Sequence, residues 1–399
     1  MNSRNAPAPD ERPRADGPAH PPARALAAGV FKAPATATSS FLPSPPGRGG
    51  GGEGERLSAT ALTPSLSPEG AVRPLTRRDL LVGAGGLFAA AGMGRLLWDR
   101  AESFWRAQVF VARSETYGPH LVDLMMDGLK ELGVDRRIVR GKTVLLKPNL
   151  VEPTVVAPHL NTHPVFVRAA AEVFRRLDAQ EVFVAEGQGH CRDTIFVLEQ
   201  SGLESVLEEE RIDFVDLNYD DLFAADNRLG LTKLPKFYLP QSIRRADFLV
   251  SLPKLKTHHW TGVTLAMKNL FGLMPGTCYG WPKNVLHHAG IGRSILDINA
   301  TVRPHLAIVD GIVGMEGDGP IMGKPKSANL VVIGGNFPAV DATCARLMGF
   351  DPRRIEYLRG ASGILGPIEE RHIEQRGELL GPLTQTFSLP DHPHFKQFR

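Results

Sequence analysis

Apolar runs alternate with helix-like patterns along the chain from residue 108 onwards. Short runs rich in Val, Ile, Leu and Phe predict buried strands, and apolar positions three or four residues apart predict amphipathic helices. The strands are expected at 109–112, 144–146, 182–185, 214–216, 248–252, 306–309 and 330–333. The helices are expected at 120–132, 164–177, 194–207 and 340–348. Such alternation is typical of an α/β fold with a mixed, largely parallel sheet and helices on both faces.

One helix start carries a clear signal. Pro164 is expected as the first residue of the helix at 164–177, because its missing N–H would have no partner there in any case. Thr162 lies just before it and is predicted to cap this helix.

Polar or glycine residues follow five of the predicted strands. In chain order these groups are Lys147, Pro148 and Asn149; Glu186, Gly187 and Gly189; Lys254 and Lys256; Asp310 and Gly311; and Gly334 and Gly335. The carboxyl ends of parallel strands meet at one edge of a sheet, where ligands bind in open α/β folds. The five groups are therefore expected at the same end of the sheet, around a common site.

The stretch at 246–276 carries the strongest chemical signal. It reads ADFLVSLPKLKTHHWTGVTLAMKNLFGLMPG, with Lys254 and Lys256 after a buried strand and Lys268 inside an apolar run. A buried ammonium group is costly unless an anion or good hydrogen-bond acceptors meet it. Any one of these side chains could be a surface lysine with its stem on apolar residues, but the cluster indicates an anion site.

With Lys147, these lysines are predicted to form a pocket that attracts phosphate or carboxylate groups as point charges. The predicted substrate-binding set is Lys147, Asn149, Lys254, Lys256, Thr257, Lys268 and Asn269. One of the lysines could have its pKa lowered by its neighbours and act as a base.

Acidic residues alternate with glycines in the segment DGIVGMEGDGP at 310–320. Carboxylates in such tightly turning loops bind hard cations such as Mg²⁺. Asp310 and Asp318 are therefore predicted ligands of a divalent metal, as an optional part of the site. The alternative is that both carboxylates cap turns through the local backbone.

The first part of the chain differs in composition from the rest. Residues 1–74 are rich in Pro, Gly, Ala and Ser, so this segment is either disordered or not translated, and both interpretations stay open. At 75–100, Arg77 and Arg78 precede an uncharged apolar run, which is the pattern of a twin-arginine export signal. The run is short for a membrane span, and no clear cleavage site follows it, so retention as an N-terminal membrane anchor stays an alternative.

Charge and cysteine content exclude several classes of function. A net charge of +3 is too mild to indicate nucleic-acid binding. Cys191, Cys278 and Cys344 are far apart in the sequence, without C-x-x-C spacing, so they cannot build a zinc site or an iron–sulfur cluster.

Six blocks carry a resemblance to a known family. They are VLLKPNLV at 144–151, NTHP at 161–164, FVAEGQG at 183–189, LVSLPKLKTHHWTGVTLAMKNLFGLMPG at 249–276, IVDGIVGMEGDGP at 308–320 and AVDATCARLMGFDP at 339–352. Together they resemble the domain of unknown function family 362 over roughly 108–365, which leaves 366–399 as a C-terminal tail. Some relatives in that family carry ferredoxin-like four-cysteine segments. This chain has none, which argues against a redox role of its own.

Histidines supply the candidate proton-transfer groups, and five of them form two adjacent pairs and a singleton: His163, His258, His259, His287 and His288. The alternative is that most of them are ordinary loop histidines. Adjacent histidines in an extended chain point to opposite sides, so at most one of each pair would face a site. His163 and His258 lie in blocks of the family pattern and are predicted, with Glu186, as the catalytic residues.

The sequence thus predicts an exported enzyme that acts on a small anionic substrate in the periplasm or on the outer face of the inner membrane. Its other expected partner is the twin-arginine export machinery. The alternative is a non-catalytic binding or accessory protein, serving an anionic metabolite or a redox or iron–sulfur partner. Substrate and reaction do not follow from the sequence.

Overall fold

The computed structural model describes residues 106–390 and 393–398. A mixed ten-stranded sheet runs through this part, with the order β12-β1-β11-β10-β7-β2-β3-β4 and with β8 and β9 attached through β10. Its strands are β1 (Ala107–Arg113), β2 (Thr143–Pro148), β3 (Glu181–Glu186), β4 (Phe214–Asp216), β7 (Phe248–Leu252), β8 (Lys254–His258), β9 (Gly262–Thr264), β10 (Leu306–Glu316), β11 (Lys324–Gly334) and β12 (Ile373–Gly377). The strands of the main path are parallel except β11. The predicted fold class is confirmed.

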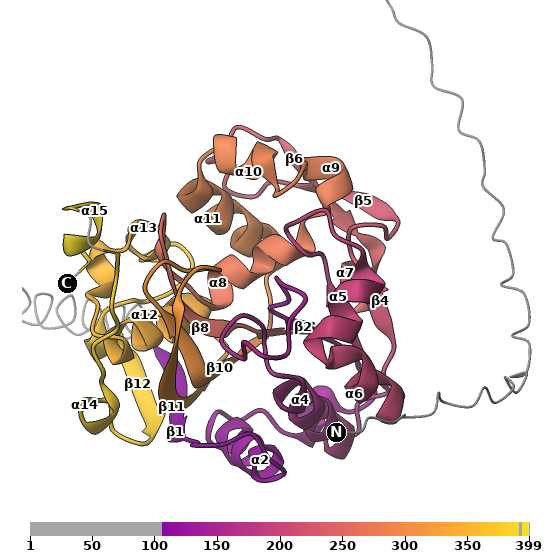
Figure 1. Cartoon of the computed structure of the whole chain (residues 1–399), viewed down its shortest axis with the longest axis horizontal. Coiled ribbons are helices and arrows are strands. Elements are labelled where there is room, and N and C mark those ends of the chain that lie inside the picture. The colour runs from indigo at the N-terminus through magenta and orange to yellow at the C-terminus, as the bar shows by residue number, and fades with distance from the viewer. Residues whose placement is uncertain (1–105, 391–392, 399) are drawn as a thin grey trace, which may run out of the picture. The chain divides into compact units, whose positions relative to one another are not determined.

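Helices pack on both faces of this sheet. They are α2 (His120–Glu131), α3 (Arg136–Val139), α4 (Pro164–Arg176), α5 (Thr194–Ser201), α6 (Leu203–Glu209), α7 (Gln241–Arg245), α8 (Ala266–Asn269), α9 (Gly276–Tyr279), α10 (Asn284–His288), α11 (Ile291–Val302), α12 (Phe337–Leu347), α13 (Glu356–Ala361), α14 (Leu380–Leu383) and α15 (Pro393–Lys396), with short 3-10 turns η1 (Leu270–Leu273), η2 (Pro352–Arg354) and η3 (Glu370–His372). In Figure 1, α2 and α4 lie on one side of the strands, and α8 and α11 on the other.

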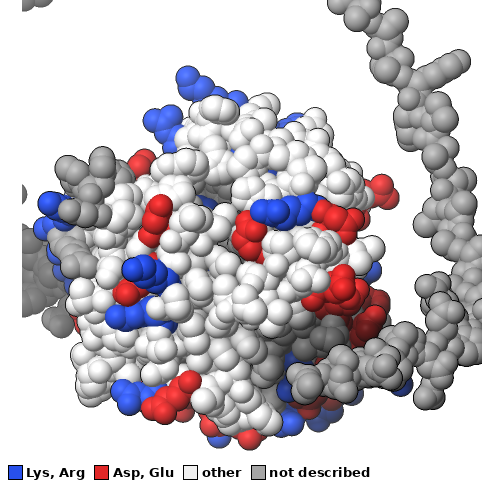
Figure 2. All heavy atoms as spheres, viewed as in Figure 1, with Lys and Arg blue, Asp and Glu red and all other residues white. Residues whose placement is uncertain are grey.

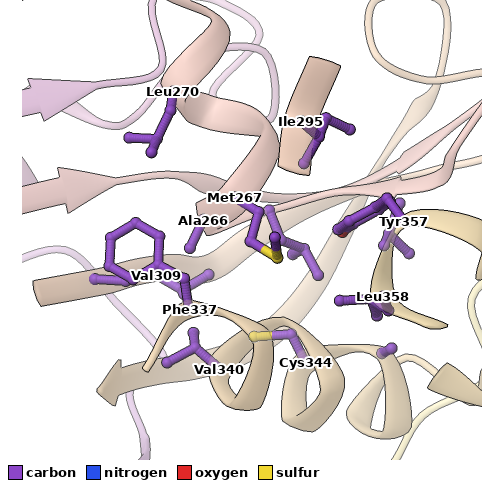
Figure 3. Close-up of a cluster of buried hydrophobic side chains, with 14 of the residues drawn as sticks. Ala266, Met267, Leu270, Ile295, Val309, Phe337, Val340, Cys344, Tyr357 and Leu358 are labelled. Atoms are coloured by element: carbon purple, nitrogen blue, oxygen red, sulfur yellow. The ribbon is translucent and has the colours of Figure 1, made fainter. Parts of the chain in front are cut away.

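The period-two pattern of the strands separates two apolar cores. In β2, Val144 and Leu146 pack with α2, α4, α5 and α6, whereas Leu145 faces the opposite core. Figure 3 shows that second core, where Met267 of α8, Ile295 of α11 and Cys344 of α12 meet. Because both faces are covered, the central strands read as continuous apolar runs.

The start of α4 shows how local sequence positions the site. Pro164 is the first helical residue, as predicted, but the capping acceptor is the His163 Nδ1, which takes the Val165 N–H at 3.2 Å. The predicted cap, Thr162, is used elsewhere: its hydroxyl donates to the Leu252 carbonyl of β7 at 2.6 Å. Thr162 therefore ties the segment before α4 to the end of a central strand.

Several elements differ from the sequence-based expectation. The helix predicted at 194–207 is two helices, because Gly202 adopts a left-handed conformation with φ 72° between α5 and α6. The sequence predicts that the polar residues at 254–258 follow the end of a strand. In the structure they form a further buried strand, β8, after a break at Pro253. Strand β11 is antiparallel to its neighbours, so Gly334 and Gly335 lie at the opposite end of the sheet from the other four groups.

The segment predicted as a C-terminal tail is part of the fold. Strand β12 pairs in parallel with β1, and Leu383 and Phe387 are buried in the core on the α12 face. The predicted strands also left out a separate hairpin, β5 (Leu222–Asp226) with β6 (Lys236–Pro240). These strands are short and mixed in polarity, so an apolar-run criterion does not find them.

Two sequence predictions lie outside the described residues, the segment 1–74 and the export signal at 75–100. Within the described residues, no helix combines the length and the apolar character that a membrane crossing needs.

Candidate functional site

A cavity of about 380 Å³ opens where β2, β3 and β8 end, beside the last residues of α8. Its wall contains the predicted site residues Lys147, Asn149, Glu186, Lys256, His258, Lys268, Asn269 and Asp318. The remaining predicted residues, His163, Lys254, Thr257 and Asp310, are not on the wall. The carboxyl-end position agrees with the rule for ligand sites in open α/β sheets.

The floor of the cavity contains a buried ion pair. The Lys147 ammonium donates to Glu186 Oε2 at 2.6 Å, and the two side chains are 1% and 4% exposed. Burial lowers the pKa of Lys147 and raises that of Glu186, and each partner opposes the shift of the other. Gly272 makes room for the pair, because a Cβ there would lie 1.9 Å from Glu186 Oε1 and 2.5 Å from Lys147 Nζ.

Asn269 supports this pair from the end of α8. Its amide donates to the Lys147 carbonyl at 3.1 Å, and its Oδ1 accepts from Lys147 Nζ at 3.3 Å. Lys147, a predicted substrate-binding residue, thus has internal partners for its ammonium group.

Lys254 forms a second buried pair outside the cavity. It stands directly opposite Asp310 in the β8–β10 ladder and donates to Asp310 Oδ2 at 2.7 Å, with both side chains fully buried. Tyr117 donates its hydroxyl to the same carboxylate at 2.9 Å, and the His163 backbone N–H does so at 3.0 Å. The His163 ring stacks on Tyr117 with centroids 3.8 Å apart. This cluster fixes the start of α4 against the sheet.

Lys256 reaches the cavity but is met by neutral acceptors. Its ammonium donates to Asn149 Oδ1 at 2.7 Å and to the Leu160 carbonyl. Burial, and then the nearby charges of Lys254 and Lys268, lower its pKa well below the usual value. Thr257, the next residue in β8, donates to the Gly317 carbonyl at 2.8 Å and so positions the segment that contains Asp318.

Lys268 is the lysine of the cavity wall whose amine has no partner in the described part of the chain. Among the described residues its ammonium has no hydrogen-bond or ion-pair partner, and it lies 5.4 Å from the centre of the Phe271 ring. The side chain keeps partial solvent access, while burial lowers its pKa to about 8. Its charge in turn helps to lower the pKa of His258 and of His287.

Lys283 is a cavity residue that the sequence analysis did not select. It is 2% exposed, donates to Asn218 Oδ1 at 2.8 Å, and has its pKa lowered to about 7 by burial. A positive φ of 68° just before α10 holds it there. The only sequence signal was a lysine after Trp281 and Pro282 in a glycine-rich segment, which is ordinary for an exposed turn.

Two cavity histidines carry their protons on different ring nitrogens. His258 Nδ1 accepts the Trp260 N–H at 3.0 Å, so in the neutral ring Nε2 holds the proton. His287 Nδ1 lies 3.0 Å from the Lys283 carbonyl, which can only accept, so Nδ1 holds the proton and Nε2 has a free lone pair. Burial lowers the pKa of both rings, and they are neutral near pH 7.

The two predicted metal ligands, Asp310 and Asp318, lie in different surroundings and contact different partners. Asp310 is engaged by Lys254 and Tyr117 inside the protein, whereas Asp318 lies at the cavity, 3.3 Å from His259 Nδ1. In the described part of the chain no group of three or more His, Cys, Asp or Glu side chains is placed to hold a metal ion. The divalent metal stays a prediction of the sequence without geometric support.

The mouth of the cavity is largely apolar. Trp260 and Met322 line it while 58% and 77% exposed, and Phe271, Pro282 and Ile321 continue the apolar wall. On the face viewed in Figure 2, charged side chains lie in small separated groups with uncharged surface between them. No broad basic area is visible among the described residues on that face, in keeping with the mild net charge.

Comparison with known families decides the assignment. Residues 144–346 match the family model described as "Domain of unknown function (DUF362)". The chain belongs to the DUF362 family. All cavity-lining lysines and histidines fall inside this DUF362 region.

Individual relatives are more distant. The thylakoid-associated protein sll1697 of Synechocystis sp. is 29% identical over 260 residues, which cover 62% of this chain and 76% of that protein. The lactate racemase apoprotein of Thermoanaerobacterium thermosaccharolyticum matches with a TM-score of 0.38 at 15% identity, over 60% of this chain and 56% of that one. A crystal structure from Thermotoga maritima matches with a TM-score of 0.35 at 12% identity, over 58% of this chain and 59% of that one. The chain thus spans less than two thirds of either solved structure, and these TM-scores support no inference about the DUF362 protein.

Proposed function

We propose that this DUF362 protein is an enzyme whose cavity binds a small substrate through a carboxylate or phosphate group. The observation that carries the proposal is Lys268, an ammonium group in an accessible cavity with no acidic partner among the described residues. Internal partners already satisfy Lys147 and Lys254. A bound anion would give the Lys268 ammonium a negatively charged partner. The attraction between the two charges is strong at short range in a partly desolvated site.

The rest of the wall fits a ligand with two parts. Lys256 and Lys283 add further N–H donors near the floor, and each already donates to a neutral oxygen. Trp260, Ile321 and Met322 offer apolar contact at the mouth. The favoured ligand therefore has an anionic head and a compact apolar body, in keeping with ligand cavities that are mostly apolar with a few placed polar groups.

The two histidines support proton transfer as the catalytic step. His258 can donate a hydrogen bond from Nε2, and His287 can accept a proton at Nε2, so the cavity holds a hydrogen-bond donor and a base. We assign these roles to His258 and His287. Glu186 orients Lys147, and His163 holds the start of α4. A non-catalytic binding protein would need the lysines alone, so the histidines separate the two hypotheses.

We also propose that the chain is exported through its twin-arginine motif at Arg77 and Arg78, and works in the periplasm or on the outer face of the inner membrane. In that compartment the cavity would meet exported or imported metabolites. The relative from Synechocystis is named for its association with thylakoids, which supports a membrane-linked location.

Calorimetry with two anionic probes tests the binding proposal. Phenyl phosphate and 3-phenylpropionate each combine an anionic head with an apolar body. We expect Lys268→Met to weaken both by about tenfold or more, which corresponds to about 1.4 kcal/mol. The matched control is Lys130→Met on α2, an exposed lysine that does not line the cavity. Equal affinities for the wild type and both variants would overturn the proposal.

A further inference from the structure

The lysines near the cavity differ in the hydrogen-bond and ion-pair partners of their amines. Lys147 and Lys254 are bound to carboxylates, and Lys256 and Lys283 donate to neutral oxygens at 2.7 and 2.8 Å. Lys268 alone among them has no hydrogen-bond or ion-pair partner in the described residues. An amine that attacks carbon must be free of such partners and must reach the ligand, and Lys268 meets both conditions.

We propose that Lys268 forms an imine with the carbonyl carbon of a 2-oxo acid bound in this cavity. The inference rests on the proposed function, because the carboxylate of a 2-oxo acid is the anionic head, and its carbonyl carbon is the adjacent atom. The carbonyl thus comes within reach of the amine that faces the anion. Lys256 and Lys283 would hold the carboxylate while Lys268 reacts.

The protonation state of Lys268 supports this chemistry. Its pKa of about 8, set by burial, leaves about a tenth of the side chain as the neutral amine near pH 7, far more than for an exposed lysine. Lys283 has a lower pKa of about 7, but the residue is only 2% exposed and its amine donates to Asn218. Lys268 is therefore the more accessible of the two lysines, and its lowered pKa provides the neutral amine that the reaction needs.

The reaction balances with the groups present. The neutral amine forms a C–N bond and the carbonyl π electrons move to oxygen, which accepts a hydrogen bond from His258 Nε2–H. His287 Nε2 takes a proton from the attacking nitrogen and passes it to that oxygen, which gives a neutral carbinolamine. His287 then moves the second nitrogen proton to the hydroxyl, which leaves as water while the C=N bond forms. Amine and ketone thus give imine and water, with no oxidant or reductant.

Reductive trapping tests this step. The full-length protein is incubated with phenylpyruvate and cyanoborohydride at a pH near the Lys268 pKa of about 8, and then analysed by intact mass and peptide mapping. We expect a mass gain equal to phenylpyruvate less one oxygen atom, located on Lys268 in excess of any exposed lysine by about tenfold or more. Labelling spread evenly over exposed lysines, or none on Lys268, would overturn the proposal.

A variant and a non-carbonyl analogue separate this inference from the proposed function. Lys268→Arg keeps the charge but cannot form the imine, so it should bind 3-phenylpropionate and show no adduct, while Lys130→Arg should label like the wild type. If Lys268→Arg does not fold, the peptide map of the wild type decides alone. Binding of 3-phenylpropionate without trapping of phenylpyruvate would refute the imine and leave the anion site standing.

Discussion

Three lysines that look alike in the sequence have different partners in the structure. Lys254 has a buried carboxylate directly across the ladder, Lys256 has neutral oxygens, and Lys268 has only the face of Phe271. The apolar context predicted that these side chains would be buried or nearly so. It could not say which one is paired, because Asp310 and Lys254 are 56 residues apart and meet only through strand order.

This difference predicts opposite effects on stability. Lys254→Met leaves the Asp310 carboxylate buried without its cation and should lower the free energy of unfolding by about 3–5 kcal/mol. Lys268→Met removes a charge whose burial opposes folding and should be neutral or raise stability by about 1–2 kcal/mol near pH 7. Denaturant unfolding of both variants measures the contrast. Comparable destabilisation by both substitutions would show that Lys268 is structural.

The pH dependence of the second effect has a definite sign. The folded pKa of Lys268 is lowered to about 8, so above that pH the folded protein loses the proton while the unfolded chain keeps it up to its ordinary value. The free energy of unfolding of the wild type therefore rises with pH from about 8 upwards. The gain in stability from Lys268→Met becomes smaller over the same range. Unfolding curves on both sides of pH 8 report this change.

At the scale of elements, the site depends on a close approach between η1 and the end of β3. Gly272 in η1 lies against the Lys147–Glu186 pair, and its carbonyl accepts the Gly187 N–H at 2.9 Å. We expect Gly272→Ala to displace the pair and to destabilise the protein by about 3 kcal/mol or more, because the new methyl group would overlap a buried carboxylate.

The control for this substitution is Gly189→Ala in the loop after β3, where a Cβ would meet its nearest neighbour at 4.0 Å. Thermal unfolding should separate the two variants clearly. If Gly272→Ala melts like Gly189→Ala, the ion pair has room to move and the packing account of η1 is wrong.

The core elements could be predicted from sequence, but two features of their arrangement could not. Apolar runs identified the central strands, because covered faces require continuous apolar residues. The reversal of β11 is set by its antiparallel pairing with both β10 and β1, which leaves no mark in its own composition. Likewise β8 follows β7 after a single proline. Its alternating lysines are typical of an exposed loop, and only the pairing of Lys254 with Asp310 across the sheet explains why they are buried.

At the scale of the whole molecule, the family pattern located the cavity because its blocks follow strands that share one edge. Lys283 and His287 lie beyond the block that ends at 276, and only the folded chain brings them to the same wall. Local sequence signals therefore indicated several residues of the cavity wall. They named His287 without selecting it and gave no indication of Lys283.

Export is a prediction for the whole chain. Replacing Arg77 and Arg78 together by lysine keeps the charge but removes the arginine pair that the signal requires, so the protein should stay in the cytoplasm. Fractionation of cells that express the tagged chain shows the outcome. Unchanged export of the double variant would refute the twin-arginine assignment.

The central claim is that the Lys268 ammonium has no partner among the described residues and binds the anionic group of a ligand. Titration of Lys268 by NMR tests this claim most directly. With the lysine side chains labelled, the Lys268 signal should titrate with a pKa of about 8 and shift to a higher pKa when phenyl phosphate binds. Lys268→Met identifies the signal by its loss. A Lys268 pKa near that of exposed lysines, unmoved by saturating phenyl phosphate, would contradict the account.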